Sequence, residues 1–449
     1  MFSDKKFAVV SLGCDKNRVD SEKLMSLIDE RGCKLTDDLQ EANIIIVNTC
    51  AFLNMARQES IDAILQCNTY RGGQLEKLVV TGCLPQKFVN ELLGELTEAD
   101  VFLGVNDYDR IFEALERSYA DEERQVNMVG TGNGQFVAKR YISTAEHYAY
   151  LKIADGCFNR CTYCLIPKIR GRYVSYPMED LLEEARGLGD IAELILVAQD
   201  VTRYGEDLYG ENRFVELLRR LTDLPNIGHL RLLYCYPEAI SDGLIREIRD
   251  NPKIFRYLDI PLQHSEDRIL RLMNRKGSRE SYLALFAKLR GEMPDICLRT
   301  TFIAGFPTET EGEFEALKGF LREAQFDNCG FFAYSKEPDT PAERMKGHLP
   351  QSVKNRRVRA LYAEQKKISA GKLAALKGTQ LRVICDGVDF EKGCFVGRSY
   401  RNAPDIDGKV YFRSAFAMQG EEYDVMINKT DSYDLYGYTK EYKDEETNL

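Results

Sequence analysis

Short apolar runs alternate with amphipathic stretches from the start of the chain, and this alternation most limits how the chain can fold. The runs are FAVVSL, IIIVNT, LVVTG and VFLGV, and amphipathic stretches such as 21–31 and 51–67 separate them. Runs of this length and β-branched content are typical of strands buried on both faces. Strands that alternate with helices form parallel sheets covered by helices. Residues 1–125 are therefore predicted to form a wound α/β domain.

A second alternating series occupies residues 146–352. Its candidate strands are AYLKIADG, AELILVAQD, HLRLLYCYP, YLDIPLQH, CLRTTFIAGFP and NCGFFAYS, with helical patterns between them. Such a series predicts an open or closed (β/α) barrel. Polar residues end several strands, among them Gln199-Asp200 and Gln263-His264. Active sites of these barrels lie at the carboxyl ends of the strands, so such residues mark the expected rim of a site.

Three further segments complete the predicted organisation. Residues 126–145 have no clear period and are expected to be a linker. Residues 353–378 hold eight Lys/Arg against one Glu and predict a basic helix, either a solvated connection or a contact for ribosomal RNA. From 379 to 449, short alternating runs punctuated by Gly and Asp predict a small antiparallel β-barrel. The expected fold class is α/β with this β domain at the end.

Composition and charge indicate a protein of a reducing compartment. No apolar run is long enough to span a bilayer, and the start MFSDKKFAVV does not resemble a signal peptide. The chain has thirteen cysteines, which are not expected to form disulfides because the cytosol keeps thiols reduced. The net charge of −10 argues against a general nucleic-acid binder. We expect a cytoplasmic monomer that does not bind membranes.

Cys157, Cys161 and Cys164 form a CxxxCxxC cluster directly after the first strand of the predicted barrel. A structural zinc site normally has four ligands, and no further Cys or His follows before His229 and Cys235. Three thiolates leave one iron of a four-iron cluster free to bind a substrate. The spacing therefore favours an iron–sulfur reaction site over a zinc site or buried core cysteines.

This motif, with Tyr163 before its last cysteine, resembles that of the radical S-adenosylmethionine (SAM) enzymes. The resemblance implies that the three cysteines hold a [4Fe-4S] cluster whose fourth iron binds the amino and carboxylate groups of SAM. Reductive cleavage of SAM then gives a radical that removes hydrogen from the substrate. The electrons are expected from a reductant such as flavodoxin or ferredoxin.

Cys14, Cys50 and Cys83 form a second trio at long spacing. Each stands directly after a predicted parallel strand, in SLGC, VNTC and VTGC. The carboxyl ends of parallel strands meet at one edge of a sheet, so the three thiols are expected to converge there. Core cysteines would instead lie within the strands. The sequence therefore predicts a second metal site.

SLGCDKNRVDSE, VNTCAF and TGCLPQK resemble the N-terminal domain of the methylthiotransferases. The order of that domain, a radical-SAM barrel and a small β domain of the TRAM type matches this family over nearly the whole chain. The resemblance implies two [4Fe-4S] clusters, the one in the N-terminal domain being the sulfur source or carrier. One SAM would supply the methyl group and a second the radical for methylthio insertion.

The methylthiotransferases include enzymes that act on tRNA adenosine and one that acts on an aspartate of small-subunit ribosomal protein twelve. SLGCDKNRVDSE and GRSYRNAPDIDGKVYF resemble the second kind, and the tRNA enzymes usually lack the KNxVDSE run. Residues 372–449 hold eleven Lys/Arg against fourteen Asp/Glu, which suits a basic protein better than RNA.

The resemblance therefore implies methylthio insertion at the β-carbon of that aspartate, on the free ribosomal protein or on the ribosomal subunit. The near alternative is the same chemistry on a tRNA adenosine. The distant alternative is a non-enzymatic zinc-bearing RNA-binding module.

Four residues are candidate cofactor contacts, and no catalytic residue is assigned. Tyr163 packs near the adenine of SAM or in the core. Gln199, Gln263 and Arg299 lie at or near strand ends, where they contact SAM or the target carboxylate or serve only the structure. His264 is expected to be a hydrogen-bonded structural residue.

Several other residues carry weaker expectations. The run 168–172 balances the charge of cluster and SAM or is a solvated loop. The chain departs from the family at Tyr176, where Arg is usual, and at Thr308, where Gly is usual. The remaining cysteines are expected to be packing residues; they are Cys33, Cys67, Cys235, Cys297, Cys329, Cys385 and Cys394.

Overall fold

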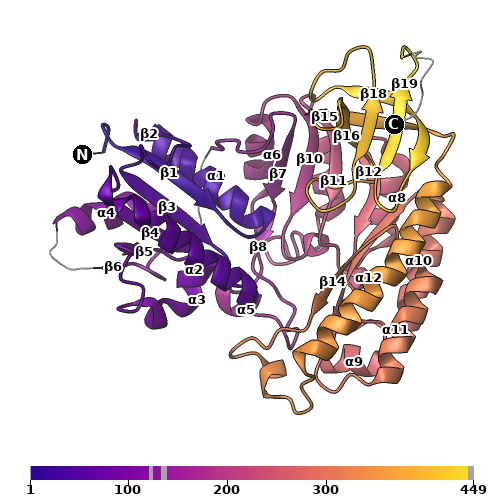
Figure 1. The fold of residues 1–449 in the computed structure, drawn as a ribbon, viewed down its shortest axis with the longest axis horizontal. Helices are drawn as coiled ribbons and strands as arrows, with labels where there is room; N and C mark the ends of the chain where they lie inside the picture. The colour runs from indigo at the N-terminus through magenta and orange to yellow at the C-terminus, as the bar shows by residue number, and fades with distance from the viewer. Residues whose placement is uncertain (1, 121–124, 133–138, 443–449) are drawn as a thin grey trace.

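The fold is that of a computed structural model, which describes residues 2–120, 125–132 and 139–442. Three units follow one another along the chain: an N-terminal α/β domain, a curled sheet backed by helices, and a small β-barrel (Figure 1). No helix of these residues is long and apolar enough to cross a membrane.

The N-terminal domain is a parallel sheet of strand order β2-β1-β3-β4-β5-β6. Its central strands β3 and β4 are buried along almost their whole length and are mostly apolar, because helices cover the sheet (Figure 1). The strands are β1 (Lys6–Ser11), β2 (Lys34–Leu35), β3 (Ile44–Thr49), β4 (Lys77–Gly82), β5 (Val101–Phe102) and β6 (Val126–Asn127). The helices are α1 (Asp15–Glu30), α2 (Asn54–Asn68), α3 (Cys83–Leu92) and α4 (Ile111–Ala120). The predicted wound sheet is confirmed, and β6 extends it into the expected linker by pairing in parallel with β5.

The central unit is a parallel sheet of order β14-β13-β12-β11-β10-β7. The sheet curls, and β7 and β14 remain as its edges, so the predicted barrel is an open half-barrel (Figure 1). The strands are β7 (Tyr148–Lys152), β10 (Ile191–Val197), β11 (Ile227–Leu232), β12 (Ile254–Asp259), β13 (Cys297–Ala304) and β14 (Asn328–Ala333), with a separate ribbon of β8 (Ala154–Asp155) and β9 (Val174–Ser175). The helices are α5 (Ile166–Ile169), α6 (Met178–Arg186), α7 (Phe214–Thr222), α8 (Asp242–Asp250), α9 (Asp267–Leu272), α10 (Arg279–Glu292), α11 (Glu311–Ala324) and α12 (Gln351–Ala374).

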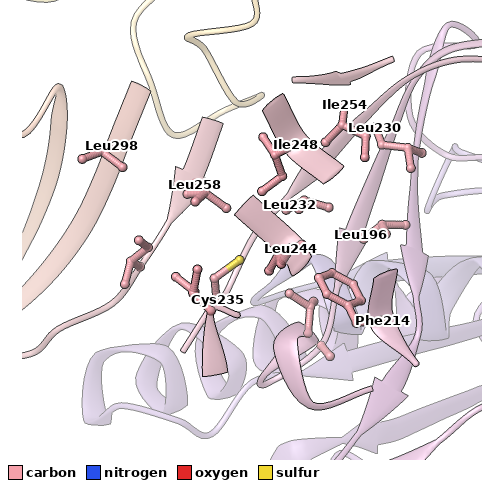
Figure 2. Close-up of a cluster of buried hydrophobic side chains, with 14 of the residues drawn as sticks. Leu196, Phe214, Leu230, Leu232, Cys235, Leu244, Ile248, Ile254, Leu258 and Leu298 are labelled. Atoms are coloured by element: carbon pink, nitrogen blue, oxygen red, sulfur yellow. The ribbon is translucent and has the colours of Figure 1, made fainter. Parts of the chain in front are cut away.

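Apolar side chains fill the layer between the half-barrel and its helices. Figure 2 shows Phe214 of α7 and Leu244 of α8 beside Leu232 of β11, and Cys235 lies in the same cluster. Burying each large apolar side chain contributes about 1.5–3 kcal/mol relative to leaving it in water. Cys235 is fully buried among apolar neighbours, as expected for a packing residue.

The basic helix α12 ends at Ala374, and Gly378 beyond it has a φ of 84°. Part of its positive charge fastens the helix to the half-barrel. Lys354 Nζ donates to the carbonyl of Tyr334 at 2.9 Å, and Arg357 pairs with the buried Glu309 at 2.6 Å. Other basic side chains of the helix, namely Arg356, Arg359, Lys366 and Lys367, are exposed. The helix is thus both a packed element and a charged surface.

The C-terminal unit is a closed barrel of order β15-β16-β17-β19-β18. Its strands are β15 (Gln380–Asp389), β16 (Cys394–Ser399), β17 (Val410–Arg413), β18 (Glu422–Thr430) and β19 (Leu435–Thr439). The prediction of an antiparallel barrel holds except for β17 and β19, which pair in parallel. Five strands are present among the described residues, and an odd number cannot alternate in direction around a closed barrel. One parallel pair is therefore unavoidable.

The C-terminal barrel is anchored inside the half-barrel by buried ion pairs. Arg231 of β11 pairs with Glu193 of β10 and donates to the carbonyl of Tyr400 at 2.7 Å. Arg398 of β16 pairs with the same Glu193. Deeper in the half-barrel, Asp407 accepts a hydrogen bond from the Tyr257 hydroxyl at 2.7 Å. The segment between β16 and β17 therefore covers the interior of the open sheet.

Thr308 follows β13 with a φ of 68°. A β-branched residue is strained in this left-handed region, where glycine is not. The structure thus explains in physical terms why glycine is usual at this position in the family that the sequence resembles.

Substitution of Arg231 by Ala is expected to loosen the C-terminal barrel. Removing one partner of a buried ion pair costs about 3–5 kcal/mol, and Arg231 is 0% exposed. Hydrogen exchange should show lower amide protection across residues 395–412, with an earlier unfolding transition in urea. Arg249, whose pairs with Asp250 and Glu292 are on the surface, is the matched control. Equal protection in R231A and R249A would contradict the anchoring role.

Candidate active site

The CxxxCxxC cysteines lie in a loop at the carboxyl end of β7. The ribbon of β8 and β9 closes the base of this loop, because Ala154 pairs with Ser175 and Asp155 with Val174. Gly156 has a φ of 71°, and a Cβ there would lie 2.0 Å from the carbonyl oxygen of Arg172. Only glycine permits this approach of the two ends of the loop.

Hydrogen-bond donors are aimed at the three sulfurs of this loop. The backbone N–H of Asn159 donates to Cys157 Sγ at 3.3 Å, and that of Ile166 donates to Cys164 Sγ at 3.4 Å. The Tyr236 hydroxyl lies 3.2 Å from Cys161 Sγ. Such donors stabilise thiolates, and hydrogen bonds to sulfur also tune iron–sulfur clusters.

Burial favours the protonated form of two thiols of the loop, Cys157 and Cys164. Burial raises the pKa of Cys157 to about 11. Burial, and then the neighbouring Cys161, raise the pKa of Cys164 above its usual value. Because a metal binds the thiolate, metal binding at this loop would release protons.

The second trio converges as its place after the strands predicts. Cys50 and Cys83 directly follow β3 and β4, and Cys14 lies just past the end of β1. These three strands are neighbours in the sheet. A Cβ on Gly13 would lie 3.1 Å from Cys50 Sγ, so the first loop reaches the second cysteine. Burial raises the pKa of Cys83 to about 12, Arg170 lowers it, and Cys14 and Cys50 raise it further. The three thiols thus share one electrostatic environment.

Asn17, in the first turn of α1, forms hydrogen bonds to the segments that carry two cysteines of this trio. Its side-chain amide donates to the carbonyl of Leu12 at 3.0 Å and to that of Thr49 at 2.9 Å. These carbonyls directly precede the loop of Cys14 and the residue Cys50. One buried amide therefore holds the ends of β1 and β3 at a fixed distance.

Arg170 joins the two cysteine sites. It stands at the end of α5 in the half-barrel, and its guanidinium reaches into the N-terminal domain to donate to Asn17 and, at 3.6 Å, to Cys83 Sγ. Its other nitrogen binds Asp20 at 2.7 Å and Asp155 at 2.8 Å. Asp155 lies two residues before Cys157, so a single side chain contacts the surroundings of both trios.

Lys152 completes this buried cluster of charges. Its ammonium pairs with Asp20, and with Asp155 at 3.0 Å. Two cations and two carboxylates thus neutralise one another at the domain boundary. Arg170 first and Lys152 next oppose the effect of burial and hold the pKa of Asp155 well below its usual value.

A second set of contacts holds the N-terminal domain against the loop that follows β14. Arg57 of α2 pairs with Glu337, and the backbone N–H of Asn54 donates to the same carboxylate at 3.2 Å. Lys87 of α3 pairs with Asp339 at 2.5 Å. The N-terminal domain is therefore fixed over the carboxyl ends of the half-barrel strands from two sides, and the cysteine trios face a common region.

The structure separates the candidate contacts by what they touch. Gln199 donates to Asp155 at 3.1 Å and so borders the charge cluster. Gln263 has a φ of 73°, and its backbone bridges to β13. Arg299 pairs with Asp259 at 3.0 Å and with Asp407 at 3.3 Å, so its charge is already neutralised. Tyr163 packs beside an apolar cluster that includes Phe306.

The structure also places three further features that the sequence singled out: His264, the run 168–172 and Tyr176. His264 is fully buried, and its Nδ1 accepts from the backbone N–H of Glu266 at 3.0 Å, which is a structural role. Within the run 168–172, Lys168 and Arg172 are exposed, whereas Arg170 is buried. Tyr176 places its ring near the ammonium groups of Lys23 and Lys152.

The trios suit iron–sulfur clusters. In the described part of the chain, no group of three or more His, Cys, Asp or Glu is arranged to hold a single metal ion. A [4Fe-4S] cluster places each thiolate on a different iron. In the cysteine loop an N–H or hydroxyl group lies at each of the three sulfurs, and in the N-terminal trio the Arg170 guanidinium lies at Cys83 Sγ, which fits thiolates that bind a cluster.

Comparisons with known proteins agree with this geometry. Family models match at residues 6–104 ("Uncharacterized protein family UPF0004"), 151–321 (radical SAM superfamily) and 378–439 (TRAM domain). A solved apo structure of the cobalamin-dependent SAM radical enzyme OxsB has a TM-score of 0.50 and 11% identity, over 71% of this chain and 51% of that chain. This likeness concerns the fold alone.

The most similar relatives include two proteins named "Ribosomal protein uS12 methylthiotransferase RimO". That of Lachnoclostridium phytofermentans is 44% identical over 436 residues, 96% of this chain and 99% of its own. That of Geobacter sulfurreducens is 44% identical over 439 residues, 96% of this chain and 98% of its own.

The cysteine loop and the sequence matches define a radical SAM enzyme with a TRAM domain, whose cofactors are SAM and an iron–sulfur cluster. Within that superfamily, the chain belongs to the ribosomal protein uS12 methylthiotransferase (RimO) family. The predicted methylthiotransferase family is thereby confirmed.

Sequence reasoning missed the residues between the trios. Lys16, Asn17 and Asp20 lie in the run SLGCDKNRVDSE, which served there only as a family resemblance. Tyr236 was noted as a strand ending, and Arg170 as one basic residue of a loop. No local pattern shows that Arg170 meets Asp20, because 150 residues separate them.

Substitution of Arg170 by Met should destabilise the domain boundary. It leaves Asp20 and Asp155 buried with Lys152 as their single cation, which costs about 3–5 kcal/mol. Urea unfolding should show a lower midpoint, and iron analysis after reconstitution should show a lower iron content. The exposed neighbour Arg172, changed to Met, is the control and should behave as the wild type. An unchanged R170M midpoint would refute the role.

Proposed function

We propose that this chain inserts a methylthio group at the β-carbon of an aspartate in ribosomal protein uS12. The convergence of two cysteine trios around the Arg170 charge cluster carries this proposal, because sulfur insertion needs a hydrogen-removing group and a sulfur carrier side by side. The names of relatives that share nearly the whole chain support uS12 as the substrate.

We assign one [4Fe-4S] cluster and SAM to Cys157, Cys161 and Cys164, and a second [4Fe-4S] cluster to the N-terminal trio. When bound, the first site supplies the radical that removes hydrogen, and the second supplies sulfur. The backbone N–H groups of Asn159 and Ile166 and the Tyr236 hydroxyl orient the three thiolates of the radical site.

The chain's own residues position the two sites and exclude water. Arg170 donates to Cys83 and so fixes the sulfur site relative to the cysteine loop of the half-barrel. Tyr163, Gln199 and Gln263 border the radical site and are assigned to SAM. Arg299 pairs with two carboxylates, so we assign it no direct contact with SAM. Its part is to hold the strand ends in place.

The remaining assignments follow the domain order. Residues 1–125 carry sulfur, 146–352 generate the radical, and the TRAM domain from 379 binds the substrate, with 126–145 and 353–378 as connections. A cytoplasmic monomer that receives electrons from a protein such as flavodoxin or ferredoxin, and acts on uS12 free or on the ribosomal subunit, completes the proposal.

The reconstituted protein is expected to methylthiolate uS12 and not tRNA. Purified uS12, small ribosomal subunits and bulk tRNA are incubated separately with protein, SAM, dithionite and sulfide, and the products are analysed by mass spectrometry. A methylthio group on the uS12 aspartate supports the proposal. Methylthioadenosine in tRNA with uS12 unmodified would replace it by the tRNA function, and colourless zinc-containing protein would remove the enzymatic function.

Cys50→Ala should separate the two sites. The variant lacks a ligand of the N-terminal trio but keeps the CxxxCxxC loop, so it should still cleave SAM to 5′-deoxyadenosine while sulfur insertion is lost. Cys157→Ala should lose both reactions. Loss of SAM cleavage in a C50A protein with an intact radical cluster, seen by electron paramagnetic resonance, would show that the division of labour is wrong.

A further inference from the structure

Most polar side chains of the run Lys16–Glu22 have hydrogen-bond or ion-pair partners. Among the described residues, Arg18 and Lys16 do not, and the half-buried Arg18 lies 5.9 Å from the centroid of the Tyr150 ring. Asn17 and Asp20 bind Arg170, and the Ser21 hydroxyl donates to that of Ser11 at 2.8 Å. Glu22 pairs with Arg140. Lys16 is only 6% exposed, yet among the described residues its ammonium makes no hydrogen bond and no ion pair.

The single contact of the Lys16 ammonium is an aromatic face. Its Nζ lies 3.2 Å from the centroid of the Tyr234 ring. Such a cation–π contact stabilises a cation by about 0.5–2 kcal/mol, whereas withdrawing an ammonium from water costs several kcal/mol. The ring covers one side of the cation and satisfies none of its N–H donors. A buried cation in this state is suited to an anion that comes from outside the chain.

The ammonium lies between the two cysteine sites. Lys16 is two residues after Cys14, and the Tyr234 hydroxyl donates to Asp15 at 3.2 Å. Tyr234 follows β11 at the carboxyl end of the half-barrel. Two residues further on, the Tyr236 hydroxyl touches Cys161. An anion on Lys16 is therefore bordered by the sulfur site on one side and the radical site on the other.

Neighbouring cations already have partners. Lys152 and Arg170 share Asp20 and Asp155, and Arg299 is neutralised by Asp259 and Asp407. Arg275 stacks on Tyr236 at 4.1 Å and donates to a backbone carbonyl. Among the described residues it pairs with no carboxylate, and its guanidinium lies near Cys161 of the cysteine loop.

We propose that the Lys16 ammonium binds the side-chain carboxylate of the substrate aspartate. This inference rests on the proposed function and assigns a specificity-determining residue to it. The β-carbon of aspartate is bonded directly to that carboxyl carbon, so anchoring the carboxylate at Lys16 holds the reacting carbon in the region between the cysteine trios. A compact ammonium with free donors forms charge-assisted hydrogen bonds to a carboxylate.

The test compares carboxylate and amide substrates on the cluster-loaded protein with SAM present. Purified uS12 with its target aspartate, and uS12 with Asn at that position, are titrated by fluorescence anisotropy under anaerobic conditions. The wild type should bind the aspartate form roughly ten- to a hundredfold more tightly, the range of a hydrogen bond to a charged group.

Lys16→Met should abolish this preference by weakening the aspartate form alone, and Lys16→Arg, which keeps the charge, should retain part of it. Lys6→Met, at an exposed pair with Glu41, is the control and should keep the full preference. Iron content is measured for each variant, so that loss of the neighbouring cluster is recognised.

Two outcomes overturn the inference alone: a wild type that modifies uS12 but binds both forms equally, and an iron-replete K16M that keeps the full preference. The first needs no variant, so it decides even where K16M fails to fold. A wild type that neither binds nor modifies uS12 removes the proposed function itself, and the two failures are thereby distinguished.

Discussion

The buried ion cluster of Asp20, Lys152, Asp155 and Arg170 is the interaction on which the functional arrangement depends. Charges taken out of water are costly unless each finds a counter-charge at hydrogen-bond distance. These four satisfy one another only when the N-terminal domain sits on the half-barrel in one orientation (Figure 1). The cluster therefore fixes how the two domains pack, and the position of one cysteine trio relative to the other follows from it.

The open edge of the half-barrel makes the other domains necessary. A curled sheet with free edges leaves polar interior residues that must be covered. From the other end of the sheet, the C-terminal unit supplies Arg398 to Glu193 and Asp407 to Arg299. The N-terminal domain covers the carboxyl ends of the strands. The site is thus enclosed by packing between units as well as by the half-barrel itself.

The thirteen cysteines divide by their place relative to the strands. Those of the two trios stand just after strands, and polar donors lie at the sulfurs of Cys83, Cys157, Cys161 and Cys164. Cys235 and Cys297 lie within buried clusters of apolar side chains, as a small apolar residue would. The thiol groups are chemically identical, and the surroundings alone decide which of them are suited to a metal.

Much of the architecture could be predicted from local sequence patterns. Strands buried on both faces must be apolar, so the strands of both sheets were visible as runs, and the cysteines after β1, β3 and β4 could be expected at one edge. Two-residue strands such as β2 and β6 are too short to leave a pattern. The predicted antiparallel barrel also left out the parallel pair of β17 and β19, which an odd-numbered closed barrel requires.

The sequence by itself determined the fold class and the family and predicted the two cysteine trios, because these depend on a local motif, on cysteines placed just after strands, or on a repeated period. The tertiary structure alone decided what lies between the trios. Arg170 and Asp20 meet across 150 residues, and Lys16 stands over the ring of Tyr234 without an ion pair to any described residue. Such contacts depend on how whole domains pack, and no local pattern records which charge will find a partner and which will be left for a substrate.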